Sequence, residues 1–257
     1  MIRFNNVSFS YRDHKVFEDL NFTLDTFTSA ALLGLNGEGK TTFIKLLLGL
    51  LKPDKGTIII DDNDINTLSE ENRSFLLSYV PQQTDDILSM SVLDFVCMGK
   101  ISQRDFFKGP DDKEKETVLS LLKTFECDEF SQRDISTLSS GQRRMIYLIR
   151  AIYQDSRIFI MDEPISSLDF LKQHELLHQL KDHLLKHDKQ LIFSIHDTCL
   201  AYEYADTFIF FKDHQLYDII KKTDDDFSKT FTRDVSALYD DKVSIRFIEG
   251  KMYMQLS

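Results

Sequence analysis

Eight consecutive residues carry the clearest chemical signal in this chain, because they fit the phosphate-binding pattern G-x-x-x-x-G-K-[ST] at every fixed position. They are Gly34, Leu35, Asn36, Gly37, Glu38, Gly39, Lys40 and Thr41, and Thr42 follows them directly. The apolar run at 30–33 predicts a buried strand before them, and the run at 43–48 predicts a buried helix after them. Since this pattern binds phosphate where it joins a strand to a helix, we expect a phosphate loop at 34–42.

The residue types of this loop suit ATP with Mg²⁺. Its glycines allow tight turns that point backbone N–H groups inward, and the following helix adds the positive end of its dipole. Lys40 supplies a flexible charge for the β- and γ-phosphates, and the Thr41 hydroxyl is the expected Mg²⁺ ligand. A glycine-rich turn would match the pattern by chance on the order of once in a hundred chains of this length, and the flanking elements lower that chance.

Two carboxylates follow a second buried strand. Residues 158–161 are apolar, and Asp162 and Glu163 come directly after them. In open α/β sheets, ligands bind at the carboxyl ends of the strands, where we expect the phosphate loop to open as well. Asp162 is suited to hold Mg²⁺, directly or through water, and Glu163 to polarise an attacking water as general base. The alternative is an ordinary strand end with two exposed acids.

His196 follows the predicted strand at 191–195, so we expect it at the same edge, within reach of the γ-phosphate. A lone histidine is otherwise structural or exposed. Ser139, Ser140, Gly141 and Gln142 precede a predicted helix. Serines at a helix start are capping residues, but hydroxyls and N–H groups there could also form a second anion site. These residues alone leave both interpretations open.

Composition limits the class of protein. The chain has 257 residues, 42% of them hydrophobic, and a net charge of −11, with no long basic run that would line a nucleic-acid groove. Cys97, Cys127 and Cys199 are odd in number and far apart, which favours a reducing compartment over a disulfide framework. The first residues show no signal-peptide pattern, and the apolar run at 46–51 is too short to cross a bilayer. We therefore expect a cytosolic protein that could dock on a membrane-bound partner.

Strands and helices alternate along much of the chain, which predicts an α/β fold with parallel pairing. Residues 2–29 predict two or three strands with a turn at 12–15, and residues 84–157 are mainly helical in character. Strands are predicted at 57–60, 75–80, 157–161, 191–195 and 208–211, helices at 91–98, 113–126, 142–153 and about 171–187, and a closing hairpin at 243–256. The acidic run at 224–226 predicts a polar break before that hairpin.

One motif points elsewhere. Residues 174–178 read H-E-x-x-H, the zinc-protease pattern. At about 100° per residue, Leu176, Leu177, Leu180 and Leu184 form one arc of the predicted helix, and His174 and His178 fall largely on the opposite, solvated face. Since no third ligand follows in a recognisable pattern, we do not expect a zinc site.

The order of motifs resembles the ATPase subunit of ABC transporters over residues 1 to about 220. That order is GLNGEGKTT at 34–42, YVPQ at 79–82, LSSGQ at 138–142, IFIMDEP at 158–164, SSLD at 166–169 and then His196. The resemblance implies a P-loop NTPase fold: a RecA-like parallel sheet core, an N-terminal antiparallel β subdomain, and an inserted α-helical subdomain at about 84–157. Residues 221–257 would then form a C-terminal extension with a β-hairpin.

The resemblance also implies roles for single residues. Tyr11 matches the aromatic that stacks on adenine, and Gln82 the glutamine that senses Mg²⁺ and couples to the membrane subunit. Residues 139–142 match the signature, which in this family closes on the ATP of a second copy in a head-to-tail dimer. Asp169 matches the acid that crosses the dimer, and His196 the switch histidine.

Some positions depart from the family pattern. Ser140 replaces a usual glycine, and if that position needs positive φ, serine costs roughly 1 kcal/mol there. Ile165 and Ser167 also differ from the usual residues, but neither change removes a catalytic group.

The segment at 90–100, and Leu168-Asp169-Phe170 with Gln173, resemble importers of iron chelates, haem and cobalamin. This implies separate partner chains, namely a transmembrane permease and, indirectly, a substrate-binding protein, with the ATPase peripheral on the cytoplasmic side of the membrane. Importers of zinc or manganese are the nearest alternative. The other alternative classes are soluble ABC ATPases acting on nucleic acid, tandem ABC translation factors and nucleotide kinases.

Overall fold

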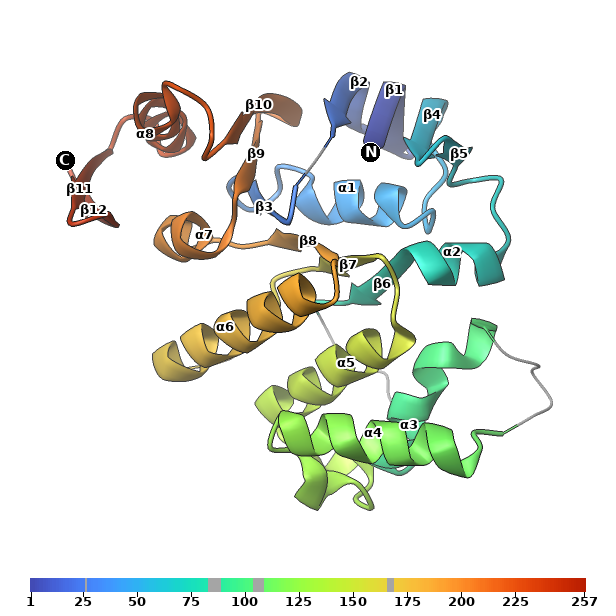
Figure 1. Ribbon diagram of the computed structural model, residues 1–257. Helices are drawn as coiled ribbons and strands as arrows, with labels where there is room; N and C mark the ends of the chain where they lie inside the picture. The colour runs from blue at the N-terminus through green and yellow to red at the C-terminus, as the bar shows by residue number, and fades with distance from the viewer. Residues whose placement is uncertain (26, 83–88, 104–108, 166–168) are drawn as a thin grey trace. The chain divides into compact units, whose positions relative to one another are not determined.

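The structure is a computed structural model that describes residues 1–257 except 26, 83–88, 104–108 and 166–168 (Figure 1). The chain divides into two compact units. The first, unit 1, contains Met1–Thr67 and Leu176–Ser257, and the second, unit 2, contains Leu68–Glu175.

Unit 1 begins with an antiparallel sheet in the order β2-β1-β4-β5. Its strands are β1 (Ile2–Tyr11), β2 (His14–Leu24), β4 (Lys55–Ile60) and β5 (Asn63–Asp64). Apolar residues alternate within each half of β1, and the register shifts between Phe4 and Val7, so that Ile2, Phe4, Val7 and Phe9 are all buried. The register of β1 against β4 shifts between Asn5 and Ser8, and this irregularity lies opposite Gly56.

A second set of strands in unit 1 runs in the order β10-β9-β3-β8. It consists of β3 (Ser29–Leu33), β8 (Gln190–Ser194), β9 (Thr207–Lys212) and β10 (Gln215–Lys221). β3 pairs in parallel with both β8 and β9, and β10 is antiparallel to β9. Every residue of β3 is buried, which explains its continuous apolar run. The predicted parallel pairing is confirmed at these strands.

Aromatic side chains fill the core of unit 1. Phe43 of α1 (Lys40–Leu47) lies 4.9 Å from Phe4 and 5.2 Å from Phe211 between ring centroids, so the helix after the phosphate loop is fixed against both sets of strands. The remaining elements of the unit are α7 (Thr198–Tyr204), α8 (Phe227–Leu238), β11 (Val243–Ile248) and β12 (Lys251–Leu256). The ring centroid of Phe231 on α8 lies 4.8 Å from that of Phe208 and 5.5 Å from that of Tyr202, so α8 also packs through aromatic contacts.

Unit 2 is mainly helical, with one parallel pair of strands, β6 (Leu77–Val80) and β7 (Ile158–Met161). Its helices are α2 (Glu70–Leu76), α3 (Val92–Cys97), α4 (Asp112–Thr124) and α5 (Ser140–Gln154), with short 3₁₀ turns at Met98–Gln103, Asp128–Phe130 and Ile135–Thr137. The long helix α6 (Phe170–Lys186) begins in unit 2 and ends in unit 1. Among the described residues, no helix combines the length and apolar content that a membrane span requires.

Several elements differ from the sequence-based predictions. The strand predicted at 75–80 begins only at Leu77, because Phe75 and Leu76 complete α2. The elements that were not predicted include β5, α2, β10, α7 and α8. The acidic run at 224–226 indicated a break, but it directly precedes α8, whose buried Phe227, Phe231, Val235 and Leu238 follow helical spacing.

Gly56 gives a direct test of the β1–β4 contact. A Cβ atom at Gly56 would lie 2.3 Å from the carbonyl oxygen of Asn6, and its φ is +83°. Gly250 has a similar φ of +77° but no neighbour within 4 Å of its Cβ position. We expect Gly250→Ala to lower the free energy of unfolding by about 1 kcal/mol through backbone strain, and Gly56→Ala to lower it by about 1–3 kcal/mol more through the clash. Denaturant titration measures both, and equal losses would contradict this account.

Candidate functional site

The phosphate loop joins β3 to α1 in unit 1, as predicted. Gly37 and Gly39 have φ values of +89° and +93°, which side chains rarely adopt. A Cβ at Gly39 would also lie 2.8 Å from the ring of Phe17, and one at Gly34 would lie 2.7 Å from the carbonyl oxygen of Phe211. Glycine is therefore required at 34 and 39 by close packing and at 37 by backbone conformation.

Lys40 is the charged centre of this loop. Its side chain is buried, at 6% exposure, and Nζ donates to the carbonyl oxygens of Gly34 at 2.7 Å and Leu35 at 2.9 Å. The N–H of Phe43 donates to the carbonyl of Gly39 at 2.8 Å, which begins the hydrogen bonding of α1. Two backbone carbonyl oxygens of the loop thus fix the position of its cation.

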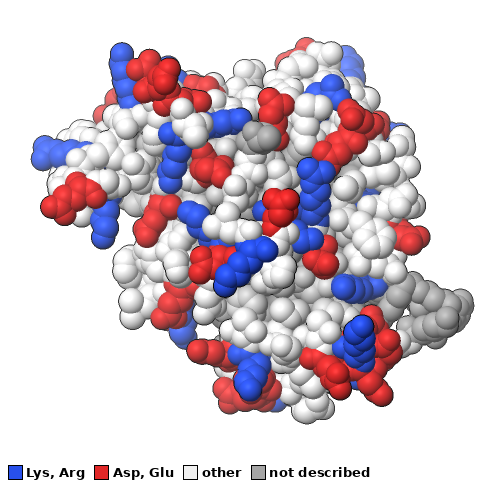
Figure 2. Space-filling view, viewed as in Figure 1, with Lys and Arg blue, Asp and Glu red and all other residues white. Residues whose placement is uncertain are grey.

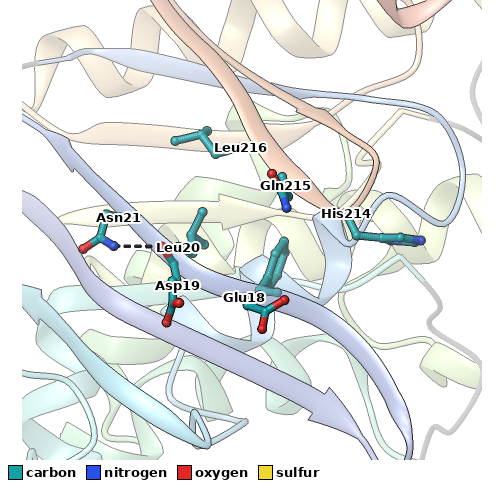
Figure 3. A pocket seen from close by; sticks show the side chains of 8 residues that line it. Glu18, Asp19, Leu20, Asn21, His214, Gln215 and Leu216 are labelled. Atoms are coloured by element: carbon teal, nitrogen blue, oxygen red, sulfur yellow. Dashed lines mark hydrogen bonds between the residues drawn. The ribbon is translucent and has the colours of Figure 1, made fainter.

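The turn between β9 and β10 supports the loop from outside. The backbone N–H of His214 donates to the Glu38 carboxylate at 2.8 Å, and Asp213 and His214 both have left-handed φ values, of 53° and 58°. A pocket of about 180 Å³ opens beside this turn, and Figure 3 shows residues of β2 and β10 lining it. None of the predicted site residues lines this pocket, so it is not the predicted nucleotide site.

His196 lies where the sequence placed it. β3 and β8 are parallel neighbours with Leu32 opposite Ser194, and the N–H of Ile195 donates to the Leu32 carbonyl at 3.3 Å. The chain therefore leaves β8 at His196 on the same edge where it leaves β3 at Gly34. His196 is exposed, and Asp197 after it caps α7. Tyr11 is the last residue of β1 in the same unit and is 43% exposed. Its ring packs edge-on against that of Phe9, with 4.9 Å between the ring centroids.

The two carboxylates lie in unit 2, at the end of the fully buried β7. Asp162 is only 1% exposed, and Glu163 is half-buried with a left-handed φ of +47°. Burial, with the negative charge of Asp162 as a second cause, raises the pKa of Tyr79 on β6 to about 12. Tyr79 therefore remains a neutral neighbour of this carboxylate across the physiological range.

Arg144 is a site residue that the sequence analysis missed. Its buried guanidinium donates to four backbone carbonyl oxygens, those of Gln82 (Nη1, 2.7 Å), Asp162 (Nη2, 3.0 Å), Glu163 (Nη2) and Pro164 (Nε, 2.6 Å). The available signal was an arginine on the apolar face of a helix, four residues before the buried Leu148. Within unit 2, Arg144 thus connects the backbone of Gln82 and of the two acidic residues to the helix that begins at the signature.

The signature residues form the start of α5. Ser139 is the N-cap, and its Oγ accepts from the N–H of Gln142 at 3.3 Å, whose side-chain oxygen accepts from the Ser139 N–H at 2.9 Å. This reciprocal pair is a capping box. Ser140 is the first residue of the helix and does not have positive φ, so the strain considered for serine at this position is absent. Gly141 follows it in the first turn.

Asp169 lies directly before α6, and its carboxylate accepts from the N–H of Lys172 at 3.1 Å. The rest of the predicted SSLD motif, residues 166–168, lies outside the described residues. On α6, the four leucines at 176, 177, 180 and 184 are buried, whereas His178 is exposed and lies 3.6 Å from Asp182. Across the parts of the chain that the structure describes, no three His, Cys, Asp or Glu side chains are grouped to hold a metal ion.

Comparison with known proteins gives a consistent family. A model described as ABC transporter matches residues 17–166. A Helicobacter pylori protein named as an iron chelatin transport ATP-binding protein is 33% identical over 218 residues, which is 84% of this chain and 86% of that protein. A petrobactin import ATP-binding protein of Bacillus anthracis is 29% identical over 82% of this chain and 77% of its own length.

Solved structures show the same fold. An inward-facing metal-chelate type ABC transporter matches with a TM-score of 0.79 at 23% identity, over 100% of this chain and 96% of that chain. A dimeric ATP-binding cassette bound to ADP and Pi matches with a TM-score of 0.77 at 23% identity, over 86% of this chain and 98% of that chain. The predicted α/β P-loop NTPase fold is therefore confirmed.

The conformation of Ser140 yields a prediction. Because Ser140 is already helical, Ser140→Gly has no strain to relieve and adds a flexible residue to the first turn of α5. We expect the free energy of unfolding to fall by at most about 1 kcal/mol. Denaturant titration checks this, and a stabilisation of about 1 kcal/mol would show that the serine is strained after all.

Proposed function

We propose, since this chain belongs to the ABC transporter family, that it binds and hydrolyses ATP to power import of a metal chelate through a separate permease. The observation that carries the ATP part is the phosphate loop, where Lys40 lies buried against the carbonyl oxygens of Gly34 and Leu35. A loop of this kind offers backbone N–H groups and one fixed positive charge to phosphate oxygens. The cargo part is supported by the names of the relatives from Helicobacter pylori and Bacillus anthracis.

In this proposal residues 34–42 hold the triphosphate. Lys40 contacts the β- and γ-phosphates, and the N-terminus of α1 adds its dipole. Tyr11 stacks on the adenine ring, for which its exposed position at the end of β1 is suited.

Mg²⁺ fits the side chains assigned to it. Thr41, Gln82 and Asp162 offer hydroxyl, amide and carboxylate oxygens, the hard donors that this ion takes in proteins. Asp162 is a buried carboxylate at a strand end, where a cation offsets the cost of its charge. When bound, Mg²⁺ supplies positive charge that neutralises the β- and γ-phosphate oxygens.

In the hydrolysis step, Glu163 acts as the general base and takes a proton from the attacking water. His196 contacts the γ-phosphate. Residues 139–142 and Asp169 act across a head-to-tail dimer, on the ATP held by a second copy of the chain. ATP then joins the two copies, and its hydrolysis separates them. This cycle moves the permease.

The remaining assignments follow from the same proposal. Residues 1–220 form the ATPase domain, with a helical subdomain inserted at about 84–157, and residues 221–257 form a C-terminal extension. Gln82 couples the ATP site to the permease. The chain works at the cytoplasmic face of the membrane as a peripheral subunit, and a substrate-binding protein delivers the chelate to the permease.

An ABC ATPase that acts on nucleic acid is an alternative function, and the distribution of surface charge bears on it. Figure 2 shows lysine and arginine intermingled with aspartate and glutamate on one face of the molecule, so the described residues of that face form no continuous basic surface. Together with the net charge of −11, this favours a protein partner over a polyanion.

Glu163→Gln tests the assignment of the base. The amide cannot accept the proton of water, so we expect ATP hydrolysis to fall about 10²–10⁴-fold while ATP binding is retained. Lys40→Ala is the contrasting variant, because it should lose nucleotide affinity instead. Steady-state hydrolysis and titration with a fluorescent ATP analogue measure the two effects, and near-normal turnover by Glu163→Gln would refute the role of Glu163.

Cargo is tested by uptake in the source organism. Cells in which Glu163→Gln replaces the native chain should lose uptake of a labelled iron chelate, haem or cobalamin, and the tagged chain should co-purify with a multi-span membrane protein. Loss of zinc or manganese uptake alone would favour the alternative importer class. If no uptake changes and no membrane protein co-purifies, the transport proposal fails.

A further inference from the structure

Arg144 is buried to an extent that is unusual for arginine, with 5% of its surface exposed. Its guanidinium meets four backbone carbonyl oxygens rather than an acidic side chain in the hydrogen bonds described above. Burial lowers the pKa of Arg144, but an arginine remains protonated throughout the physiological range. Each of these contacts is therefore a charge-assisted hydrogen bond to the main chain.

The four acceptors come from two loops. Asp162, Glu163 and Pro164 are successive residues directly after β7, and Gln82 follows β6. A carbonyl oxygen fixes the plane of its peptide, and the peptide planes on either side of a residue fix the direction of its side chain. The planar guanidinium has five N–H groups in a rigid fork, so it can hold all four carbonyls at once, whereas a lysine offers a single flexible charge.

The backbone held in this way is not in its relaxed state. Glu163 has a left-handed φ of +47°, which costs a non-glycine residue energy unless its surroundings maintain it. Arg144 donates to the carbonyl of Glu163 itself and to those on either side of it. The conformation that sets where the Glu163 carboxylate projects is thus maintained from α5.

We propose that Arg144 is a positioning residue that locks the backbone of Gln82 and Glu163 to the N-terminal half of α5, so that Gln82, the general base and the signature keep one arrangement. This inference rests on the proposed function, because it takes the roles of Gln82 and Glu163 from there. Arg144 does not touch ATP in this arrangement. Its contribution is to hold the water-activating carboxylate in place during turnover.

The experiment compares Arg144→Ala and Arg144→Lys with Arg150→Met as the matched control. Arg150 lies on the same helix and is half-buried, but its guanidinium lies over the ring of Phe95, 4.9 Å from the centroid. The control therefore removes a desolvated arginine from α5 without touching the carbonyls after β7. Measurements are kcat for ATP hydrolysis, equilibrium affinity for a fluorescent ATP analogue, thermal unfolding, and hydrolysis with guanidinium ion added at matched ionic strength.

We expect Arg144→Ala to lower kcat about 10–100-fold, as misplacement of a catalytic group does, while ATP affinity changes less than about threefold. Low-millimolar guanidinium should restore a measurable part of kcat in Arg144→Ala and none in Glu163→Gln. Arg144→Lys should fold like the wild type but hydrolyse ATP with a lower kcat. Arg150→Met should keep the wild-type kcat and show no response to guanidinium.

Three results would overturn the inference. The first is a wild-type kcat in folded Arg144→Lys. The second is a parallel loss of kcat and ATP affinity in Arg144→Ala that guanidinium does not rescue. The third is a loss of kcat in Arg150→Met as large as that in Arg144→Ala. Should Arg144→Ala not fold, Arg144→Lys alone decides. The outcome is also separable from that of the proposed function: an inactive Glu163→Gln with normal Arg144 variants would reject only the positioning role, whereas an active Glu163→Gln would reject the role of the base itself.

Discussion

Both units place a buried cation against backbone carbonyl oxygens, and the geometry of the proposed site depends on this interaction. In unit 1 the cation is Lys40, held by the carbonyls of Gly34 and Leu35. In unit 2 it is Arg144, held by carbonyls after β6 and β7. A buried charge is costly unless it is hydrogen-bonded, so each cation stabilises only the loop conformation that turns its carbonyls inward. The conformation of each loop is therefore tied to the position of its cation.

The two cations differ in a way that suits different tasks. A lysine ammonium is a compact charge on a flexible stem, so Lys40 can exchange a carbonyl for a phosphate oxygen with a small rotation. An arginine fork loses several hydrogen bonds together when it moves, and Arg144 has no comparable replacement for four carbonyls. One position is thus built to exchange partners and the other to keep them. This difference suits the proposed roles, in which Lys40 binds phosphate and Arg144 holds the main chain.

Much of this arrangement could be predicted from the sequence, wherever the signal is local. The phosphate loop has fixed spacing, and the strand before Asp162 is a continuous apolar run, so both were found without tertiary information. β10 was missed because it is an edge strand with few buried residues, and α8 because the acids at 224–226 suggested a break. The role of Arg144 depends on residues 18 to 62 positions away, which no local pattern encodes. The left-handed backbone at Glu163 was likewise beyond a pattern that predicted only a strand end.

The signature shows how two interpretations left open by the sequence can both hold. The capping box uses the oxygen of the Ser139 hydroxyl as an acceptor for the N–H of Gln142. A hydroxyl has a donor hydrogen as well, and the capping role does not use it. The helical conformation of Ser140 keeps its N–H in the first turn, where helix N–H groups have no intrahelical acceptor. Capping therefore orders this helix start with the N–H groups of Ser139 and Gln142 and does not use the hydroxyl hydrogen of Ser139. Arg144, one turn further along the same helix, holds the backbone carbonyls after β7.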